Sequence, residues 1–257
     1  MLVPKLHIYD ISPDVTAFST TRHGGYGSGV YGEFNINHYC GDDETCIDNN
    51  AEALSLELNV KKDDIIMPHQ THCTEVMQIA KDFIPLPGNV KKMILEGVDA
   101  LITDVKGLCI GVSTADCIPI LIYDEAHHAA AAVHAGWRGT VKRIAMKAVS
   151  AMRVTYGSRP EDLTAVIGPG ISLEAFEVGD EVYEEFASAG FCMADISRRY
   201  DKWHIDLPEC NRSQLSAAGV SDIRMTGICT YNNSADFFSA RRLGVASGRI
   251  FTGIILR

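Results

Sequence analysis

Residues 108–140 read LCIGVSTADCIPILIYDEAHHAAAAVHAGWRGT and contain three apolar runs, over 108–112, 118–123 and 129–134. Each run is continuous rather than alternating, which is typical of strands buried on both faces. Strand follows strand here, without the regular helical crossovers of a Rossmann fold. We therefore expect mixed β-sheets with helices outside them.

Helical periodicity is rarer than strand-like patterning in the rest of the chain. It is clearest over 140–156, where Ile144, Val149 and Met152 recur near 3.6-residue spacing. No linker and no internal repeat is found, so the sequence predicts one domain over residues 1–257. The other expected elements are helices over 48–58, 182–189 and 208–218 and strands over 15–21, 65–69, 75–79, 100–103, 165–167, 224–229 and 249–256.

The composition excludes several classes of protein. The 257 residues include 33 acidic and 23 basic side chains, a net charge of −10, which argues against a protein that coats nucleic acid or an anionic membrane surface. Hydrophobic residues at 46% and charged residues at 22% are typical of a globular protein. With no long apolar run and no signal-peptide pattern, the expected location is cytoplasmic.

The cysteine pattern does not indicate a disulfide scaffold. There are eight cysteines and no CxxC pair, so we expect reduced thiols, most of them buried as small apolar residues.

Three residues at the ends of strand-like runs carry metal-binding chemistry. His72, Cys117 and His134 are separated by 45 and 17 residues. Two imidazoles and a thiolate suit zinc, and three protein ligands leave a fourth position for water. The same residues allow other interpretations: a buried thiol with two hydrogen-bonded histidines, or a Cys117 nucleophile with His134 or His72 as its base and Arg138 favouring the thiolate.

Residues near two turns are candidates for binding a ligand. Arg138 lies two residues before the start of the helix predicted over 140–156, a position that suits phosphate or carboxylate, although a surface ion pair is the commoner role. Trp137 either stacks on a ring or packs. Arg22 and Asn35 flank a glycine-rich segment whose backbone can approach a ligand closely, or which is a plain turn-rich hairpin.

Short motifs that occur in order over nearly the whole chain resemble the laccase-domain family, whose members are often labelled polyphenol oxidase or purine nucleoside phosphorylase. These motifs are Thr21-Arg22-x-Gly24-Gly25, Phe34-Asn35-Ile36, Cys40-Gly41-Asp42-Asp43, Gln70-x-His72, Val98-Asp99-Ala100-Leu101-x-Thr103, Thr114-Ala115-Asp116-Cys117-x-Pro119, His134-Ala135-Gly136-Trp137-Arg138-Gly139, Ile167-Gly168-Pro169-x-Ile171 and Phe238-Ser239-x-Arg241-Arg242.

The resemblance implies a single α+β domain of layered mixed β-sheets with outer helices, and a zinc ion held by His72, Cys117 and His134. It also implies phosphorolysis of adenosine, inosine, guanosine and methylthioadenosine, and deamination of adenosine. The chain departs from the family pattern at Cys73, where glycine is frequent, and at Leu243, where an aspartate is frequent. Both departures bear on substrate preference more than on the class of reaction.

The residues discriminate among these activities. Nine histidines without one HxH pair do not provide the ligands of a multicopper oxidase, although copper-dependent phenol oxidation at the single site stays open. Deamination suits a three-ligand zinc, which lowers the pKa of bound water toward about 7, with Asp116 as a candidate to move protons.

Phosphorolysis requires a phosphate site, for which Arg22 and Arg138 are candidates, with Asn35 and Trp137 near the substrate. The expected partners are therefore a purine nucleoside and phosphate, without nucleic acid or membrane. Two alternatives remain: a cysteine hydrolase that uses Cys117 and His134, and a purely structural zinc that Cys73 completes.

Overall fold

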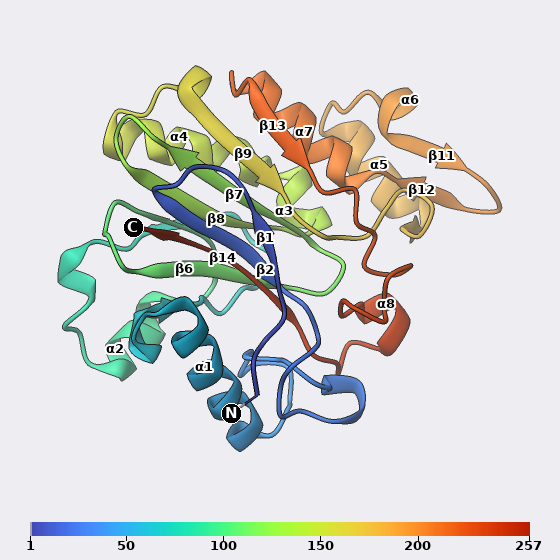
Figure 1. Ribbon diagram of the computed structural model, residues 1–257. Coiled ribbons are helices and arrows are strands. Elements are labelled where there is room, and N and C mark those ends of the chain that lie inside the picture. The colour runs from blue at the N-terminus through green and yellow to red at the C-terminus, as the bar shows by residue number, and fades with distance from the viewer. Residues whose placement is uncertain (1) are drawn as a thin grey trace.

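The structure, a computed structural model that describes residues 2–257, is dominated by two large β-sheets (Figure 1). The strands are β1 (Leu6–Tyr9), β2 (Val15–Thr20), β3 (Ile65–Ile66), β4 (Glu75–Gln78), β5 (Val98–Thr103), β6 (Cys109–Thr114), β7 (Ile118–Asp124), β8 (Ala129–Ala135), β9 (Leu163–Ile167), β10 (Glu177–Val178), β11 (Ser197–Arg199), β12 (Trp203–Ile205), β13 (Asp222–Met225) and β14 (Ile250–Leu256).

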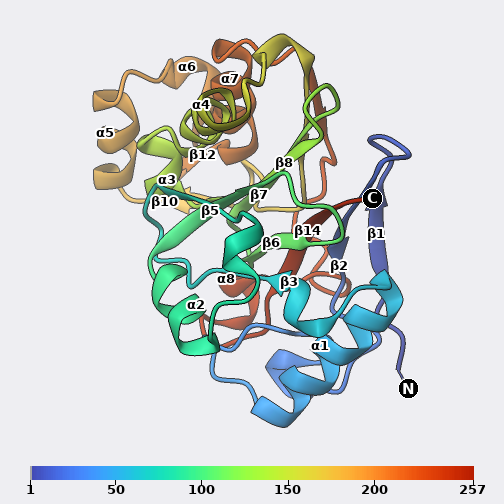
Figure 2. The same cartoon turned by 90° about the vertical axis from the view of Figure 1, so that its left-hand side faces the viewer.

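The helices lie outside the large sheets, as Figure 2 shows. They are α1 (Glu44–Leu58), α2 (Gly88–Ile94), α3 (Trp137–Val141), α4 (Ile144–Tyr156), α5 (Asp180–Ser188), α6 (Met193–Ile196), α7 (Leu207–Ala217) and α8 (Ala240–Leu243), with short 3-10 turns at Gly29–Tyr31, Lys62–Asp64, Lys81–Phe83 and Pro160–Asp162.

Both large sheets are mixed. The five-stranded sheet has the order β1-β2-β14-β6-β3, and the six-stranded sheet has the order β13-β9-β7-β8-β5-β4. Most neighbouring strands are antiparallel, whereas β3 with β6, β13 with β9 and β4 with β5 are parallel. A small antiparallel sheet, β10-β12-β11, carries α5 beside it. The expected mixed sheets with outer helices are confirmed.

Side chains from alternate strand positions pack the two large sheets against each other. Leu121 and Tyr123 of β7 and Ala132 of β8 face this layer, where they join Ile110 and Ile254 of the other sheet. The intervening residues of β7 and β8 face α4 and α7 instead. Every residue of β7 and β8 is buried, which explains why their sequences are almost continuously apolar rather than alternating, with Asp124 and His134 as the exceptions.

Helices cover the outer faces of this sandwich. The predicted periodic residues Ile144, Val149 and Met152 of α4 are buried against the six-stranded sheet. On the opposite side, Leu54 and Leu58 of α1 pack on the five-stranded sheet. The layers therefore run helix, sheet, sheet, helix. None of the helices in residues 2–257 combines the length and the apolar character that crossing a bilayer requires.

β14 lies in the middle of the five-stranded sheet, between β2 and β6. Thr252 is opposite Ser19 of β2 on one side and Val112 of β6 on the other. Segments from the start, the middle and the end of the chain thus share one sheet.

Several predicted elements need correction. The helix expected over 140–156 is two helices, α3 and α4, because Arg143 between them has a left-handed backbone (φ 65°). The Arg143 guanidinium donates to the carbonyl of Ala189 and packs over the Phe191 ring, which holds this break in place. The strands expected over 65–69 and 224–229 are reduced to β3 and β13. The other expected helices and strands are present within a few residues of their predicted ends.

The prediction that most cysteines are buried is wrong. All eight are free thiols, but only Cys109, Cys210 and Cys229 are buried in the structure of residues 2–257. The others lie in loops and at helix ends, where the sequence offers no periodicity from which burial can be inferred.

Candidate metal centre and its cavity

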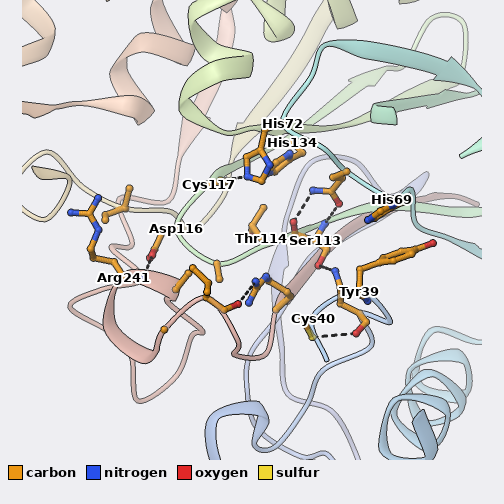
Figure 3. A pocket seen from close by; sticks show the side chains of 18 of the residues that line it. Tyr39, Cys40, His69, His72, Ser113, Thr114, Asp116, Cys117, His134 and Arg241 are labelled. Atoms are coloured by element: carbon orange, nitrogen blue, oxygen red, sulfur yellow. Dashed lines mark hydrogen bonds between the residues drawn. The ribbon is translucent and has the colours of Figure 1, made fainter. Parts of the chain in front are cut away.

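The structure brings His72, Cys117 and His134 together at one end of the six-stranded sheet. Their ligand atoms all lie within 4.8 Å of one another, and Cys117 Sγ is 3.8 Å from His72 Nε2. The rings of His72 and His134 meet edge to face, with centroids 4.9 Å apart. Figure 3 shows the two histidines next to each other, with a dashed line that joins His72 to Cys117.

Strand pairing explains how two of these residues meet. β7 and β8 are antiparallel with Pro119 opposite His134, so Cys117, which precedes β7, lies at the same end of the sheet as His134. His72 arrives from the loop between β3 and β4 and has a left-handed backbone (φ 63°). A non-glycine residue in this conformation is uncommon and must be held by its surroundings.

Asp99 of β5 holds both histidines. Its carboxylate accepts a hydrogen bond from His134 Nδ1 at 2.6 Å and others from the backbone N–H groups of Thr71, His72 and Cys73 at 3.2, 3.1 and 2.7 Å. These three N–H groups fix the strained loop around His72. The hydrogen bond to Nδ1 leaves Nε2 of His134 directed toward Cys117, the arrangement typical of a histidine that binds metal.

The electrostatics favour an ionised thiol. Burial would raise the pKa of Cys117, but the neighbouring His134 and His72 outweigh it and lower the pKa to about 6. Burial would likewise lower the pKa of His134, but the Cys117 thiolate and Asp99 raise it to about 9. Hydrogen bonding to His134 and the loop N–H groups lowers the pKa of Asp99 despite its burial. Without metal, Cys117 and His134 thus form a thiolate–imidazolium pair at neutral pH.

The space between the three side chains fits a metal ion. A Cβ at Gly136 would lie 2.8 Å from His72 Cδ2 and 3.1 Å from Cys117 Sγ, so only glycine leaves this space open. For tetrahedral zinc, ligand atoms are roughly 3.3–3.6 Å apart, close to the 3.8 Å between Sγ and Nε2. Within residues 2–257 this is the one group of three or more such side chains, and Cys73 is not a member. The three residues can therefore hold one metal ion.

The cluster opens into a cavity of about 700 Å³, within the range of roughly 300–1,000 Å³ typical of small-molecule sites. Six stretches of the chain line it: 37–40, 69–72, 113–117, His134, 171–176 and 240–249. From left to right, Figure 3 labels Arg241, Asp116, Cys117, Thr114, Ser113, Tyr39 and His69 along its wall.

The far end of the cavity carries an aromatic pair. Tyr39 and His69 stack with ring centroids 3.9 Å apart, and the Glu96 carboxylate accepts a hydrogen bond from His69 Nδ1 at 2.8 Å. Gln70 ties this loop to β6, because its amide exchanges hydrogen bonds of 2.8 and 2.7 Å with the backbone of Ser113. Gln70 therefore positions the segment that carries His72.

Asp116 is the carboxylate on the cavity wall. Its two oxygens accept hydrogen bonds of 2.7 Å from Thr230 Oγ1 and from the backbone N–H of Arg241. Like His72, it has a left-handed backbone (φ 89°). Each carboxylate oxygen has a further lone pair, so Asp116 can still accept a proton from the cavity side.

Four other sequence candidates lie outside the lining of this cavity. Arg22 donates from Nε and Nη1 to the carbonyls of Gly32 and Ser234. Asn35 is fully buried and donates to Asp42. Arg138 is exposed and its guanidinium stacks on Trp137. These contacts hold loops together, and a direct role for the four residues in substrate binding stays a prediction.

The sequence reasoning did not identify Asp99, Gln70, Tyr39, His69 or Arg249 as site residues, all of which hold or line the site. One signal was available for Asp99, which is the single charged residue in the apolar strand 98–103. A lone charge in a strand with both faces covered must have a dedicated partner.

A sandwich of mixed sheets with a three-donor cluster at one end defines a class of mixed α/β domain with a candidate metal centre. The chain belongs to the family described as "Multi-copper polyphenol oxidoreductase laccase", whose model matches residues 16–257. The resemblance seen in the sequence is thereby confirmed.

Two curated relatives match almost the whole chain. A protein named "Purine nucleoside phosphorylase" from Bacteroides thetaiotaomicron is 44% identical over 248 residues, 95% of this chain and 92% of its own length. A protein named "Adenosine deaminase RL5" from an unknown prokaryotic organism is 45% identical over 245 residues, 93% of each chain. The crystal structure of hypothetical protein YfiH from Bacillus licheniformis superposes with a TM-score of 0.88 at 30% identity, over 95% of this chain and 93% of that one.

Proposed function

We propose that the chain is a zinc-dependent enzyme of purine nucleosides. It cleaves adenosine, inosine, guanosine or methylthioadenosine with phosphate into the base and a sugar 1-phosphate, and it deaminates adenosine. The observation that carries this proposal is the His72–Cys117–His134 cluster opening into a nucleoside-sized cavity. The names of the two relatives supply the reactions.

Zinc is the metal that the donor set favours. One thiolate and two imidazoles suit zinc, and copper is the alternative because it shares these ligands. A bound zinc ion supplies a Lewis acid that stabilises negative charge and activates water. A multicopper oxidase needs several ligand clusters, whereas residues 2–257 contain one, so we do not propose laccase chemistry despite the family's description.

The residues around the cluster have separable roles in this proposal. Asp99 fixes the orientation of His134 and the loop of His72. Asp116 faces the cavity and is the carboxylate available to move a proton to or from the purine. Tyr39 offers an aromatic surface on which a base can stack.

One observation favours a second candidate, a cysteine hydrolase. Cys117 has a pKa lowered to about 6 and stands beside His134, which Asp99 orients, an arrangement that resembles a nucleophile–base–carboxylate triad. Metal binding and nucleophilic attack use the same sulfur, so the two functions exclude each other. A hydrolase would retain its activity after chelation and lose it on alkylation.

Product analysis by mass spectrometry tests the proposal. Metal-loaded protein is incubated with adenosine, with and without phosphate. Adenine and ribose 1-phosphate formed only with phosphate establish phosphorolysis, and inosine formed in both establishes deamination. A Cys117→Ala variant should lose both activities, whereas Cys192→Ala, which removes an exposed thiol outside the cluster, should keep them. No turnover by the zinc-loaded protein would refute the nucleoside function.

A further inference from the structure

Arg249 is a cation on the cavity wall that has no acidic partner. It immediately precedes β14 and is half-buried. The arginines of residues 2–257 that form ion pairs are Arg159, Arg212 and Arg224. A half-buried charge without a counter-ion is unfavourable unless a ligand provides one.

The Arg249 guanidinium is held with one edge available. Nη1 donates to the carbonyls of Ser247 and Gly248, and Nη2 donates to the carbonyl of Val245 at 2.8 Å. An arginine has five N–H donors. In the described chain, the donor on Nε and one of the two donors on Nη2 have no assigned partner. This is the edge of the fork that binds two oxygens of a phosphate or carboxylate. Because its own loop fixes the plane, little entropy is lost on binding.

Thr114 provides an unpartnered hydroxyl on the same wall. Its side chain is 1% exposed, and Oγ1 is buried without a hydrogen-bond partner. Thr114 ends β6 opposite Ile250, the residue that follows Arg249, so paired strands place the two residues near each other. Figure 3 shows Thr114 beside the His72–Cys117–His134 cluster. A buried hydroxyl with no partner indicates a missing ligand group.

The charge of the cavity wall supports an anionic ligand. Its charged lining residues in the described chain are Arg241, Arg249 and Asp116, apart from the histidines and thiols. Both oxygens of Asp116 already accept hydrogen bonds. A protein of net charge −10 thus has a cavity wall with more positive than negative side chains. An acidic molecule that binds an anion needs such a local excess of positive charge.

We infer that Arg249 and Thr114 form an oxyanion subsite that binds phosphate next to the metal cluster. Nε and Nη2 of Arg249 donate to two phosphate oxygens, and Thr114 Oγ1 donates to a third. The reaction that uses this phosphate rests on the proposed function, whereas the subsite itself does not. In phosphorolysis, one phosphate oxygen bonds to C1′ of the ribose while the C1′–N9 bond breaks. The electron pair leaves with the purine, and the proton of the hydrogen phosphate ends on the purine.

Three variants test this subsite. Arg249→Met removes the charge and donors at similar length, Thr114→Val removes only the hydroxyl, and Arg242→Met is the matched control. Arg242 lies outside the cavity lining on the same C-terminal segment, where it stacks on Tyr231. Loss of a charge-assisted hydrogen-bonding group should raise the KM for phosphate about 10- to 100-fold in Arg249→Met, and loss of a hydroxyl about 2- to 10-fold in Thr114→Val. Arg242→Met should match the wild type.

A second readout does not require catalysis. Inorganic phosphate should raise the Tm of the wild type and of Arg242→Met, and this rise should disappear in Arg249→Met. Deamination of adenosine without phosphate should match the wild type in Arg242→Met, which lies outside the cavity lining. Circular dichroism spectra and the Tm without phosphate show whether Arg249→Met and Thr114→Val are folded. Adenosine 5′-monophosphate is then tested as a competitor of inorganic phosphate. If it competes with the wild type but not with Arg249→Met, the subsite also binds the phosphate group of nucleotides. Absence of competition would restrict it to inorganic phosphate.

The results separate the subsite from the reaction. Suppose that the wild type cleaves nucleosides only with phosphate, and that Arg249→Met and Thr114→Val keep its KM for phosphate and its phosphate-induced Tm shift. This result would overturn the subsite and leave the proposed function intact. A phosphate-induced Tm shift that needs Arg249, in a wild type that does not cleave nucleosides, would support the subsite and refute the function.

Discussion

Two buried carboxylates flank the candidate metal ligands, and they face different parts of the site. Asp99 is fully buried, lies outside the cavity lining and holds His134 together with the loop of His72. Asp116 is on the cavity wall and ties Thr230 to the backbone of Arg241. Although Asp116 is the sequence neighbour of Cys117, it is Asp99, far from both histidines in the sequence, that supports the ligands. Asp99 should therefore determine metal affinity, and Asp116 should determine the reaction rate.

The largest effect is expected from Cys117→Ala, which removes the site that both carboxylates serve. Loss of one of three ligands should abolish stoichiometric zinc binding. Turnover of adenosine should fall by three or more orders of magnitude, because a Lewis acid lowers the activation barrier by several kcal/mol. Metal analysis and product formation measure this result. Full activity in a metal-free Cys117→Ala protein would exclude the metal site altogether.

Asp116→Asn should affect the rate without affecting the metal. If Asp116 moves a proton, kcat should fall about 100-fold or more, while zinc affinity stays within about twofold of the wild type because Asp116 does not contact a ligand's imidazole. Thr230→Val is the matched control, because it removes one hydrogen bond to Asp116 and keeps the carboxylate. Equal losses of kcat in the two variants would assign Asp116 a purely structural role.

Asp99→Asn should show the opposite pattern. Zinc affinity should fall about 10- to 100-fold, as for other groups that orient a metal-binding histidine. The free energy of unfolding should fall by about 1–3 kcal/mol, because three N–H groups lose a charged acceptor. Competition with a zinc chelator and urea denaturation measure the two effects.

Asp124 offers a control in the same sheet. It is also fully buried, at the other end of the sheet, and binds His127 Nδ1 at 2.8 Å. Asp124→Asn should reduce stability and leave zinc affinity unchanged. If it weakened zinc binding as much as Asp99→Asn, general destabilisation would explain both results.

The smallest expected effect, about tenfold for a change of one pH unit, is the pH dependence of zinc binding. The binding form has a Cys117 thiolate and a neutral His134. With pKa values of about 6 for Cys117 and about 9 for His134 in the metal-free protein, zinc displaces one proton from His134 between pH 6 and 9. Affinity should therefore rise about tenfold per pH unit over this range and more steeply below pH 6.

Calorimetric titration with zinc in two buffers of different ionisation enthalpy counts the protons released. About one proton is expected at pH 7.5. If no proton is released and the zinc affinity does not change between pH 6.5 and 8.5, the thiolate–imidazolium pair does not form.

The sequence predicted the layers of the fold better than their details. Continuous apolar runs identified β7 and β8, because strands with both faces covered need no polar residues. The small β10-β12-β11 sheet was missed, because strands of two or three residues leave no periodic pattern. The break at Arg143 was missed as well, because a left-handed arginine is stabilised by a distant carbonyl, that of Ala189, and not by local propensity.

The site was predictable where residue types carry the chemistry. His72, Cys117 and His134 were chosen for their side chains, and the structure places them together. Arg22 and Arg138 were chosen because they are cations near turns, but their guanidinium groups lie against carbonyls and Trp137. Arg249 had no comparable signal, because its position on the cavity wall depends on β14 lying beside β6.

The central position of β14 also has a consequence for folding kinetics. Its partners, β2 and β6, lie more than 130 residues earlier in the sequence, so the five-stranded sheet closes only after very long loops have been ordered. Such a high contact order slows folding. Until β14 docks, the edges of β2 and β6 that it covers are open to pairing with other chains. Refolding yield should therefore depend on protein concentration, even though the native sheet hides both edges.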